Sequence, residues 1–444
     1  MIPASAVFDQ STITALLEHD PLVADYRAFF ASLDWSLVDH WQARRSARGR
    51  PAHPEHAYLK AFLVRLREGL LFTSQLRRFL LSHPLLVIEL GFELHLDAGQ
   101  PYGFDVARTI PSQQWLRAKL RTCDQALLQE LLHATVQALQ AEIPGLGEII
   151  AFDVKHIYAW VKQNNLRVSM VDRFCKDQQP SGDPDCRVGV KRSTNRELPD
   201  GSTKEVKEYL WGYGSGVAAA TMADYGDVVL AEYTQPFNET DVTYFRPLYQ
   251  RTVVALEQFP THVTADAAFD AWYVYEGPAR HGGIAAVPLN QHHPGLQRDG
   301  DGTPLCAKGL RMTATFCYDH PYGFRARRFR CPLLFPQPTA QSCDHEQFAK
   351  GKGRQKDPNW ELGGLQRVLL DRDGPLYHAV YSQRTACERI NSQAKALGIE
   401  RPKVRNGRSV ATLNTLIYLV INVRALQRAK SINAGLLSCP KGIR

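Results

Sequence analysis

Several features that would assign this chain of 444 residues to a specialised class are missing from its sequence. Its first residues contain no basic segment followed by an apolar run, so we expect no secretory signal. The most apolar stretch, 413–426, is interrupted by Asn414, Asn422 and Arg424, and we expect it to be too short and too polar to span a bilayer. No internal repeat is visible. We therefore expect a cytoplasmic protein with no membrane partner.

The cysteine pattern lacks the C-x2-C spacing of a zinc knuckle. Nine cysteines, an odd number, are scattered along the chain, which favours reduced thiols over a disulfide framework. One set of residues could still bind zinc: Cys306, Cys317, Cys331, Cys343 and the nearby His345. This leaves open a zinc-dependent structural or nuclease protein, although buried free thiols are the favoured interpretation.

The overall composition is that of an ordinary folded protein, with 44% hydrophobic and 22% charged residues. A chain of this length predicts two or three domains. Lysine and arginine exceed the acidic residues, which gives a net charge of +8. This excess suits a polyanionic partner such as DNA but does not by itself prove one.

Residues 1–143 predict an all-α N-terminal domain, which carries two candidate DNA-binding features. Leucines recur at helical spacing from Leu59 to Leu70, a second helix is expected after a cap at Thr73-Ser74, and a further amphipathic stretch covers 112–139. The helices at 54–70 and 72–90 could form a helix-turn-helix, or could simply pack together. A basic cluster that could contact phosphates, or be a solvated loop, consists of Arg44, Arg45, Arg48 and Arg50.

The pattern changes at Pro144, and residues 144–430 predict an α/β domain, followed by a C-terminal tail at 431–444. A strand is expected at 146–152, a hairpin follows around residues 224–226, and a helix runs from Thr240 to about Leu256. Strands at 261–265 and 284–289 then enclose a helix at 269–276. This order predicts a mixed sheet with helices on its faces. Two polar stretches, about 163–207 and 291–376, are expected to be insertions, the second with strands at 311–318 and 323–329.

The most informative segment runs from Tyr381 to Lys395. On one continuous helix, Tyr381, Arg384, Glu388 and Lys395 would share one face. The opposite face would collect the apolar side chains of Ala386, Ile390, Ala394 and Leu397. From helix geometry alone, this could equally be a solvated face with pairs such as Arg384–Glu388.

The same four residues match the pattern Y-x2-R-x3-E-x6-K with every gap correct, and the segment therefore resembles a large group of insertion-sequence transposases of the DDE type. That resemblance implies that residues 144–430 are a catalytic domain with a ribonuclease-H-like mixed sheet and insertions, preceded by the all-α domain with a DNA-binding role. It also implies a prokaryotic, nucleoid-associated protein. It makes Glu388 the third metal-binding carboxylate and implies that Tyr381, Arg384 and Lys395 contact DNA. The group's β-rich insertion would correspond to the polar stretch after Asn290.

The group also requires two earlier aspartates at strand ends. Asp153 follows the apolar run 147–152, and Asp266 follows 261–265. Asp270 is an alternative to Asp266, but it lies one helical turn further on and is expected to point elsewhere. Each aspartate alone could be only a helix cap or turn residue. Lys155 and His156, just after Asp153, could assist or be incidental exposed neighbours.

This residue set suits phosphodiester chemistry. Two Mg²⁺ ions, which Mn²⁺ could replace, would be held by Asp153, Asp266 and Glu388, because hard divalent ions prefer oxygen ligands. The expected reaction is strand cleavage at transposon ends followed by strand transfer into target DNA. The implied partner is double-stranded DNA, both terminal inverted repeats and target, bound by a homodimer or higher oligomer. The alternative is a transposase-derived DNA-binding protein with a silent or repurposed site.

Overall fold

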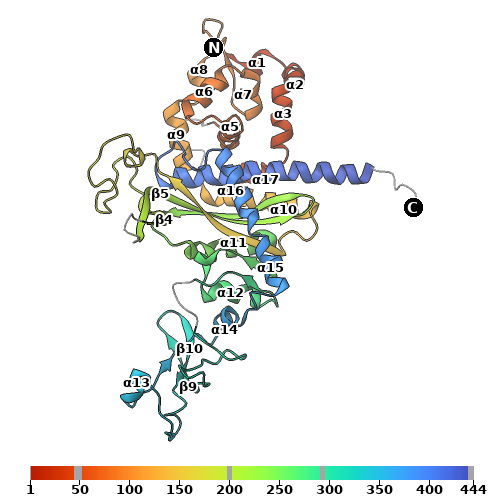
Figure 1. Ribbon diagram of the computed structural model, residues 1–444. Helices are drawn as coiled ribbons and strands as arrows, with labels where there is room; N and C mark the ends of the chain where they lie inside the picture. The colour runs from red at the N-terminus through yellow and green to blue at the C-terminus, as the bar shows by residue number, and fades with distance from the viewer. Residues whose placement is uncertain (1, 45–52, 198–202, 291–295, 439–444) are drawn as a thin grey trace. The chain divides into compact units, whose positions relative to one another are not determined.

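The computed structural model describes residues 2–44, 53–197, 203–290 and 296–438 (Figure 1). Its internal contacts separate the chain into two units. Unit 1 comprises residues 1–147, 153–258 and 386–444, and unit 2 comprises residues 148–152 and 259–385. The chain passes between the units within one strand, β3 (Ile149–Tyr158), whose first residues belong to unit 2 and whose remainder, from Asp153, belongs to unit 1.

The first part of unit 1 is almost entirely helical, as its leucine pattern predicts, apart from the short pair β1 (Ile2–Pro3) and β2 (His95–Leu96). Side chains of Asp9, Asp20, Asp105, Ser112 and Asp124 accept hydrogen bonds from the first turns of their helices. The helices are α1 (Ala4–Val7), α2 (Gln10–His19), α3 (Pro21–Phe30), α4 (Ser36–Ala43), α5 (Glu55–Arg67), α6 (Thr73–Leu81), α7 (Pro84–Leu90), α8 (Val106–Thr109), α9 (Gln113–Thr122) and α10 (Gln125–Glu142).

Some helix boundaries in this part of unit 1 differ from the sequence-based expectation. The stretch 72–90 is two helices, α6 and α7, separated at Ser82 and His83. The stretch 112–139 is two helices, because Asp124 interrupts the first and caps α10. The cap expected at Thr73-Ser74 is wrong: Phe72 is the N-cap of α6, and its N–H donates to Oε1 of Gln75. The Thr73 side chain is thus not used as a cap.

The strands of unit 1 follow the predicted hairpin. β5 (Thr203–Met222) pairs antiparallel with β4 (Arg187–Glu197) through its first half and with β6 (Gly226–Pro236) through its second half. On its other side β5 neighbours β3. Gly214 and Gly216 admit the ring of Tyr244, since a Cβ at either position would lie within 2.6 Å of that side chain. Because β4 and the start of β5 fall within 163–207, part of this expected insertion is sheet. The short helix η1 (Lys162–Asn164) precedes β4, and η2 (Asp241–Tyr244) and α11 (Phe245–Leu256) follow β6.

The last helix, α17 (Gly407–Ser438), crosses unit 1 beside α10 and β6 (Figure 1). It is longer than the apolar stretch 413–426 and includes residues 431–438, which were expected in the tail. By length and hydropathy residues 407–436 could cross a bilayer, but 89% of their most apolar window is buried inside the protein, as in the core helix of a folded domain. Asn422 on this helix is fully buried and bonds both the N–H and the C=O of Val229 on β6.

Unit 2 contains the parallel part of the sheet. β7 (His262–Thr264) pairs parallel with the first residues of β3 and with β8 (Ala285–Ala286). Ala286 packs with Tyr377 and Val380 in a buried cluster. Tyr377 and Val380 lie on α15 (Pro375–Ser382). The other helices of unit 2 described so far are η3 (Ala267–Phe269), α12 (Trp272–Ala279) and α14 (Leu362–Leu369).

The expected strands of the second insertion are present with slightly shifted bounds. β9 (Thr313–His320), β10 (Phe324–Arg330) and β11 (Gln355–Lys356) form a separate antiparallel sheet in the order β11-β10-β9. The short helix α13 (Glu346–Ala349) precedes β11. Together with the parallel and antiparallel strands around β3, these elements confirm a mixed α/β architecture preceded by helices.

Candidate functional site

Asp153 lies within β3, not at its end as the sequence suggested. The run Ile150–Phe152 is buried, and the strand continues through Val154 to Tyr158. The main chain after Asp153 stays extended beside β5, which the apolar run alone could not indicate. Asp153 is half-buried and faces a cavity of about 410 Å³ in unit 1.

Glu388 reaches the same cavity from α16 (Thr385–Ala396). The buried face of this helix contains Ala386, Ile390 and Ala394, as the sequence predicted. On a different side, Arg389 binds both carboxylate oxygens of Asp227 through Nε and Nη2, at 2.8 and 2.7 Å. These contacts fix the rotation of α16 and leave Glu388 exposed at its first turn, where the helix dipole favours a carboxylate.

Asn391, one turn after Glu388, is a site residue that the sequence analysis did not single out. Its Nδ2 donates a hydrogen bond of 2.8 Å to Oδ2 of Asp153, and its side chain lines the same cavity. Asn391 is only 8% exposed, and its Oδ1 is buried without a hydrogen-bond partner among the described residues. A buried carbonyl oxygen in that state is costly, and a bound cation or water would relieve the cost. The i, i+3 spacing from Glu388 was the available signal.

Basic side chains surround these acids. Lys395 lies 3.3 Å from Oε2 of Glu400, and Lys155 lies 3.7 Å from the same atom. Burial would raise the pKa of Glu400, but the charge of Lys155 and the hydrogen bond and charge of Lys395 outweigh it and lower that pKa. Lys155 is half-buried, so it is not an incidental exposed neighbour. Lys395, expected to contact DNA, is exposed at the rim of the cavity and makes an ion pair there.

His156 also lines the cavity, and its ring packs edge-on against Phe237 with centroids 4.7 Å apart. Burial lowers its pKa to about 4, helped by the nearby charges of Lys155 and Lys191. The imidazole is therefore neutral at neutral pH and does not add to the positive charge of the site.

Asp266 belongs to unit 2, where it follows β7 as the sequence predicted. Its side chain accepts a hydrogen bond of 2.9 Å from the N–H of Ala268 and caps the short helix η3. Asp270 has a different role: its carboxylate is 1% exposed, binds the guanidinium of Arg367 and accepts a hydrogen bond from the N–H of Asn290. Burial would raise the pKa of Asp270, but the hydrogen bonds from Arg367 and Asn290 outweigh it and lower that pKa.

The single helix expected over 381–395 is wrong. α15 ends at Ser382 and α16 begins at Thr385, with a turn at Gln383 and Arg384. In this turn the N–H groups of Gln383 and Arg384 bond carbonyls three residues back, so the α-helical register is lost. Tyr381 stacks on Tyr377 with centroids 5.7 Å apart, and the Arg384 guanidinium lies 5.9 Å from the Tyr381 ring. Tyr381 and Arg384 therefore belong to unit 2 and do not share one helix face with Glu388.

The donor set of the cavity fits a hard divalent cation. Asp153 and Glu388 supply carboxylates, and Asn391 supplies a buried carbonyl oxygen without a partner. Oxygen ligands of this kind suit Mg²⁺ or Mn²⁺. Within the part of the chain that the structure describes, no three or more His, Cys, Asp and Glu side chains are gathered so that they could hold a metal ion. The fit therefore rests on two carboxylates and one amide.

Two other expected sites have different outcomes. The zinc alternative finds no support among the described residues: Cys306 and Cys331 are buried, Cys317 is exposed and Cys343 is half-buried, and all four are free thiols. In the N-terminal basic cluster, Arg44 ends the described segment, and Arg45, Arg48 and Arg50 lie outside the described residues.

Comparison with known proteins finds a likeness among solved structures, and that likeness is weak. No protein-family model matches the chain, and no curated protein matches it. Among solved structures, the chain is similar to the cryo-EM structure of a piggyBac transposase synaptic complex with hairpin DNA, with a TM-score of 0.30 and 12% sequence identity. The match covers 95% of this chain and 83% of that chain. At this TM-score the likeness supports no argument about fold or activity.

Proposed function

We propose that this chain is a metal-dependent DNA transposase of the DDE type, which cleaves strands at transposon ends and transfers them into target DNA. The observation that carries the proposal is the meeting of Asp153 and Glu388, far apart in sequence, in one cavity with the unpartnered oxygen of Asn391. Glu388 is also the glutamate of the Y-x2-R-x3-E-x6-K pattern, so geometry and resemblance select the same residue.

We further propose that the sheet is ribonuclease-H-like. What supports this is the strand order β4-β5-β3-β7-β8, with β6 also paired to β5, in which β3, the first of these strands in sequence, is central. An antiparallel hairpin follows it in sequence, and the later strands β7 and β8 are parallel. In such a sheet the central strand holds an acidic residue, which here is Asp153.

The side chains of the cavity can take different roles in phosphodiester cleavage. A divalent cation, when bound, would polarise the phosphate and activate the attacking oxygen. Asp153 and Glu388 would hold that cation, and Asn391 would orient Asp153 while offering its own Oδ1. Lys395 would leave its ion pair with Glu400 and bind a DNA phosphate instead, since both partners are anions and Lys395 is exposed. Asp266 remains the proposed third carboxylate, and Tyr381 and Arg384 proposed DNA contacts, on the resemblance alone.

The experiment is a strand-cleavage assay on duplex DNA that carries the ends of the element flanking the gene, with Mg²⁺ or Mn²⁺. The wild type should release strands with 3′-hydroxyl ends, whereas Glu388→Ala and Asp153→Ala should lose cleavage by a hundredfold or more, the order of effect for a residue that positions or stabilises reacting groups. The exposed Glu18→Ala in α2 is a matched control and should cleave like the wild type.

Two outcomes would overturn the proposal. Equal cleavage by Glu388→Ala and the wild type would show that the acidic pair is not the active site. Tight binding to the ends without cleavage would instead favour a transposase-derived DNA-binding protein with a silent site. In the active case, two or more copies of the chain would assemble on DNA, because two ends must be joined in one event.

A further inference from the structure

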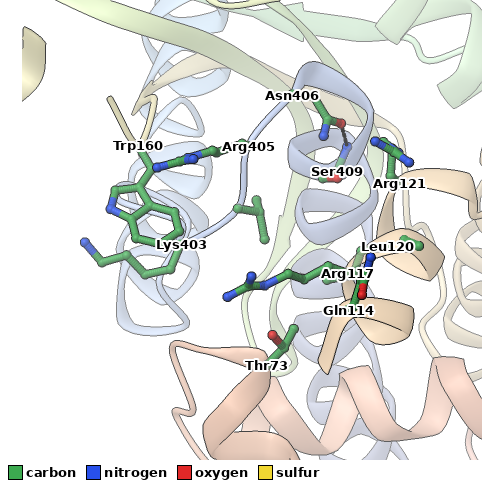
Figure 2. Close-up of a pocket in the computed structure, with 12 residues that line it drawn as sticks. Thr73, Gln114, Arg117, Leu120, Arg121, Trp160, Lys403, Arg405, Asn406 and Ser409 are labelled. Carbon is green, nitrogen blue, oxygen red and sulfur yellow. Dashed lines mark hydrogen bonds between the residues drawn. The ribbon is translucent and has the colours of Figure 1, made fainter. Parts of the chain in front are cut away.

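A second cavity of unit 1, of about 540 Å³, lies away from Asp153 and Glu388 (Figure 2). Its wall comes from the start of α6, one face of α9, Trp160 shortly after the end of β3, and the segment that leads into α17. The lining residues include four cations, Arg117, Arg121, Lys403 and Arg405, and no carboxylate. A concave surface with this charge is suited to an anion.

The four cations of this cavity are not neutralised by the protein. Among the described residues none of them makes an ion pair with an acidic side chain. Arg117 and Arg121 are four residues apart on α9, so they project from the same face. The Trp160 ring instead holds two of the cations, with the Arg405 guanidinium 4.9 Å and Lys403 Nζ 5.8 Å from its centroid. Cation–π contacts position these groups while leaving their charge available.

A buried hydroxyl in the same wall is an independent sign of a ligand. Thr73 is 5% exposed, and its Oγ1 has no hydrogen-bond partner among the described residues. Phe72 and Gln75 already cap α6, so Thr73 is not needed there. Figure 2 shows Thr73 below Arg117 at the edge of the hollow. A buried hydroxyl without a partner costs stability unless something in the cavity bonds it.

The N-terminus of α17 does not by itself account for the site. Oδ2 of Asp185 already accepts the N–H of Gly407, and Oδ1 of Asn406 accepts that of Ser409. The anion would therefore be bound by side chains. The cavity is too small for a duplex but large enough for phosphates of a strand that passes over it, with arginine guanidinium groups offering paired donors.

From these observations we infer that this cavity binds phosphate groups of the DNA backbone, through Arg117, Arg121, Lys403 and Arg405, with Thr73 donating a hydrogen bond. The choice of DNA as the polyanion rests on the proposed function, but the cavity itself does not depend on catalysis. Such contacts position a nucleic acid without reading its sequence.

The test is the binding of a fluorescent DNA duplex of arbitrary sequence to the full-length chain in EDTA, measured by anisotropy at several salt concentrations. The double variant Arg117→Gln/Arg121→Gln should bind about tenfold or more weakly. Its slope of log affinity against log salt should fall by about 2, since each lost phosphate contact removes about 0.9. Thr73→Val should weaken binding a fewfold and leave the slope unchanged, because the hydroxyl carries no charge.

The matched control is Arg78→Gln/Lys430→Gln, which removes the same charge from exposed positions on α6 and α17 that do not line the cavity. If this control loses as much affinity and slope as the cavity variant, bulk charge explains the effect and the inference is overturned. An unchanged slope in the cavity variant overturns it as well.

Two further arms separate the alternatives. Inorganic phosphate should displace DNA from the wild type more than chloride of equal ionic strength does, and less from the cavity variant, because phosphate and DNA compete for the same cations. Phosphate that binds the wild type, measured by titration without DNA, but does not weaken DNA binding would identify a free-phosphate site and overturn binding of a strand. Parallel cleavage assays with Mg²⁺ separate this inference from the proposed function. If Glu388→Ala cleaved like the wild type, the proposed function would fail, while the slope measured in EDTA would still decide the role of the cavity.

Discussion

Asn391 donates a hydrogen bond from Nδ2 to Oδ2 of Asp153 and thereby joins α16 to β3 across 2.8 Å. The bond holds one carboxylate oxygen in a fixed direction and turns the amide oxygen Oδ1 to a buried position without a partner. Because Glu388 is one turn away on the same helix, the bond also fixes the relation between the two acids.

We predict that Asn391→Leu weakens Mn²⁺ binding by about tenfold or more, since loss of a group that orients a ligand has effects of roughly ten- to a hundredfold. Isothermal titration of the full-length protein with Mn²⁺ measures this. The substitution keeps the branched shape of the side chain and replaces the amide by methyl groups. Ser392→Ala, at the next position on α16 and also beside the cavity, is the control and should leave the affinity within a fewfold. Unchanged affinity in Asn391→Leu would exclude an amide ligand.

Asp266 and Asp270 are expected to respond differently to the same substitution. Asp270→Asn should destabilise unit 2 by about 3 kcal/mol, because it leaves Arg367 without its buried partner. Asp266→Asn should change stability by less than about 1 kcal/mol, since asparagine caps a helix as well as aspartate does. Only Asp266→Asn should abolish cleavage while the protein stays folded. Urea denaturation and the cleavage assay together test this, and a folded, fully active Asp266→Asn would remove Asp266 from the site.

The stability of unit 1 should depend on His156 in acid. Its pKa is lowered to about 4 in the folded protein, whereas an unfolded histidine titrates near 6.5. The unfolded chain thus binds the proton first, so stability is complete above about pH 6.5 and falls as the pH drops toward 4, by at most about 3 kcal/mol. Denaturation in EDTA should show a flatter pH profile for His156→Gln. The exposed His378→Gln should keep the wild-type profile, and identical profiles for all three would contradict the prediction.

The buried amide of Asn422 should contribute strongly to the core. Asn422→Ala leaves the N–H and C=O of Val229 without partners, at a cost of about 3 kcal/mol in the free energy of unfolding. Gln427→Ala, at an exposed position of the same helix, should change it by less than about 0.5 kcal/mol. Urea denaturation measures both, and equal effects would show that the bonds to β6 carry no special weight.

Local patterns predicted the elements well where one physical effect dominates. The hairpin around residues 224–226 follows from turn residues between apolar runs, and the helix ending at Leu256 follows from its periodicity. The buried face of α16 was predicted for the same reason, because Ala386, Ile390 and Ala394 recur at helical spacing.

Features that depend on distant partners were not predictable. The length of β3 past Asp153 is set by its neighbour β5, and the break between α15 and α16 is a turn that no proline or glycine marks. Asn391 was missed because a polar residue on a helix becomes informative only when its partner, Asp153, is known. The basic cavity combines α6, α9 and the segment before α17, which no single window of sequence brings together.

The long final helix has a consequence for how the protein comes into being. Because α17 supplies the interior against α10 and β6, unit 1 lacks its centre until residues 407–438 have left the ribosome. The helices at the start of unit 1 therefore cannot complete their packing until α17 has been synthesised. A gene copy that loses its 3′ end would yield a chain with an exposed apolar sheet face, prone to aggregate or be degraded.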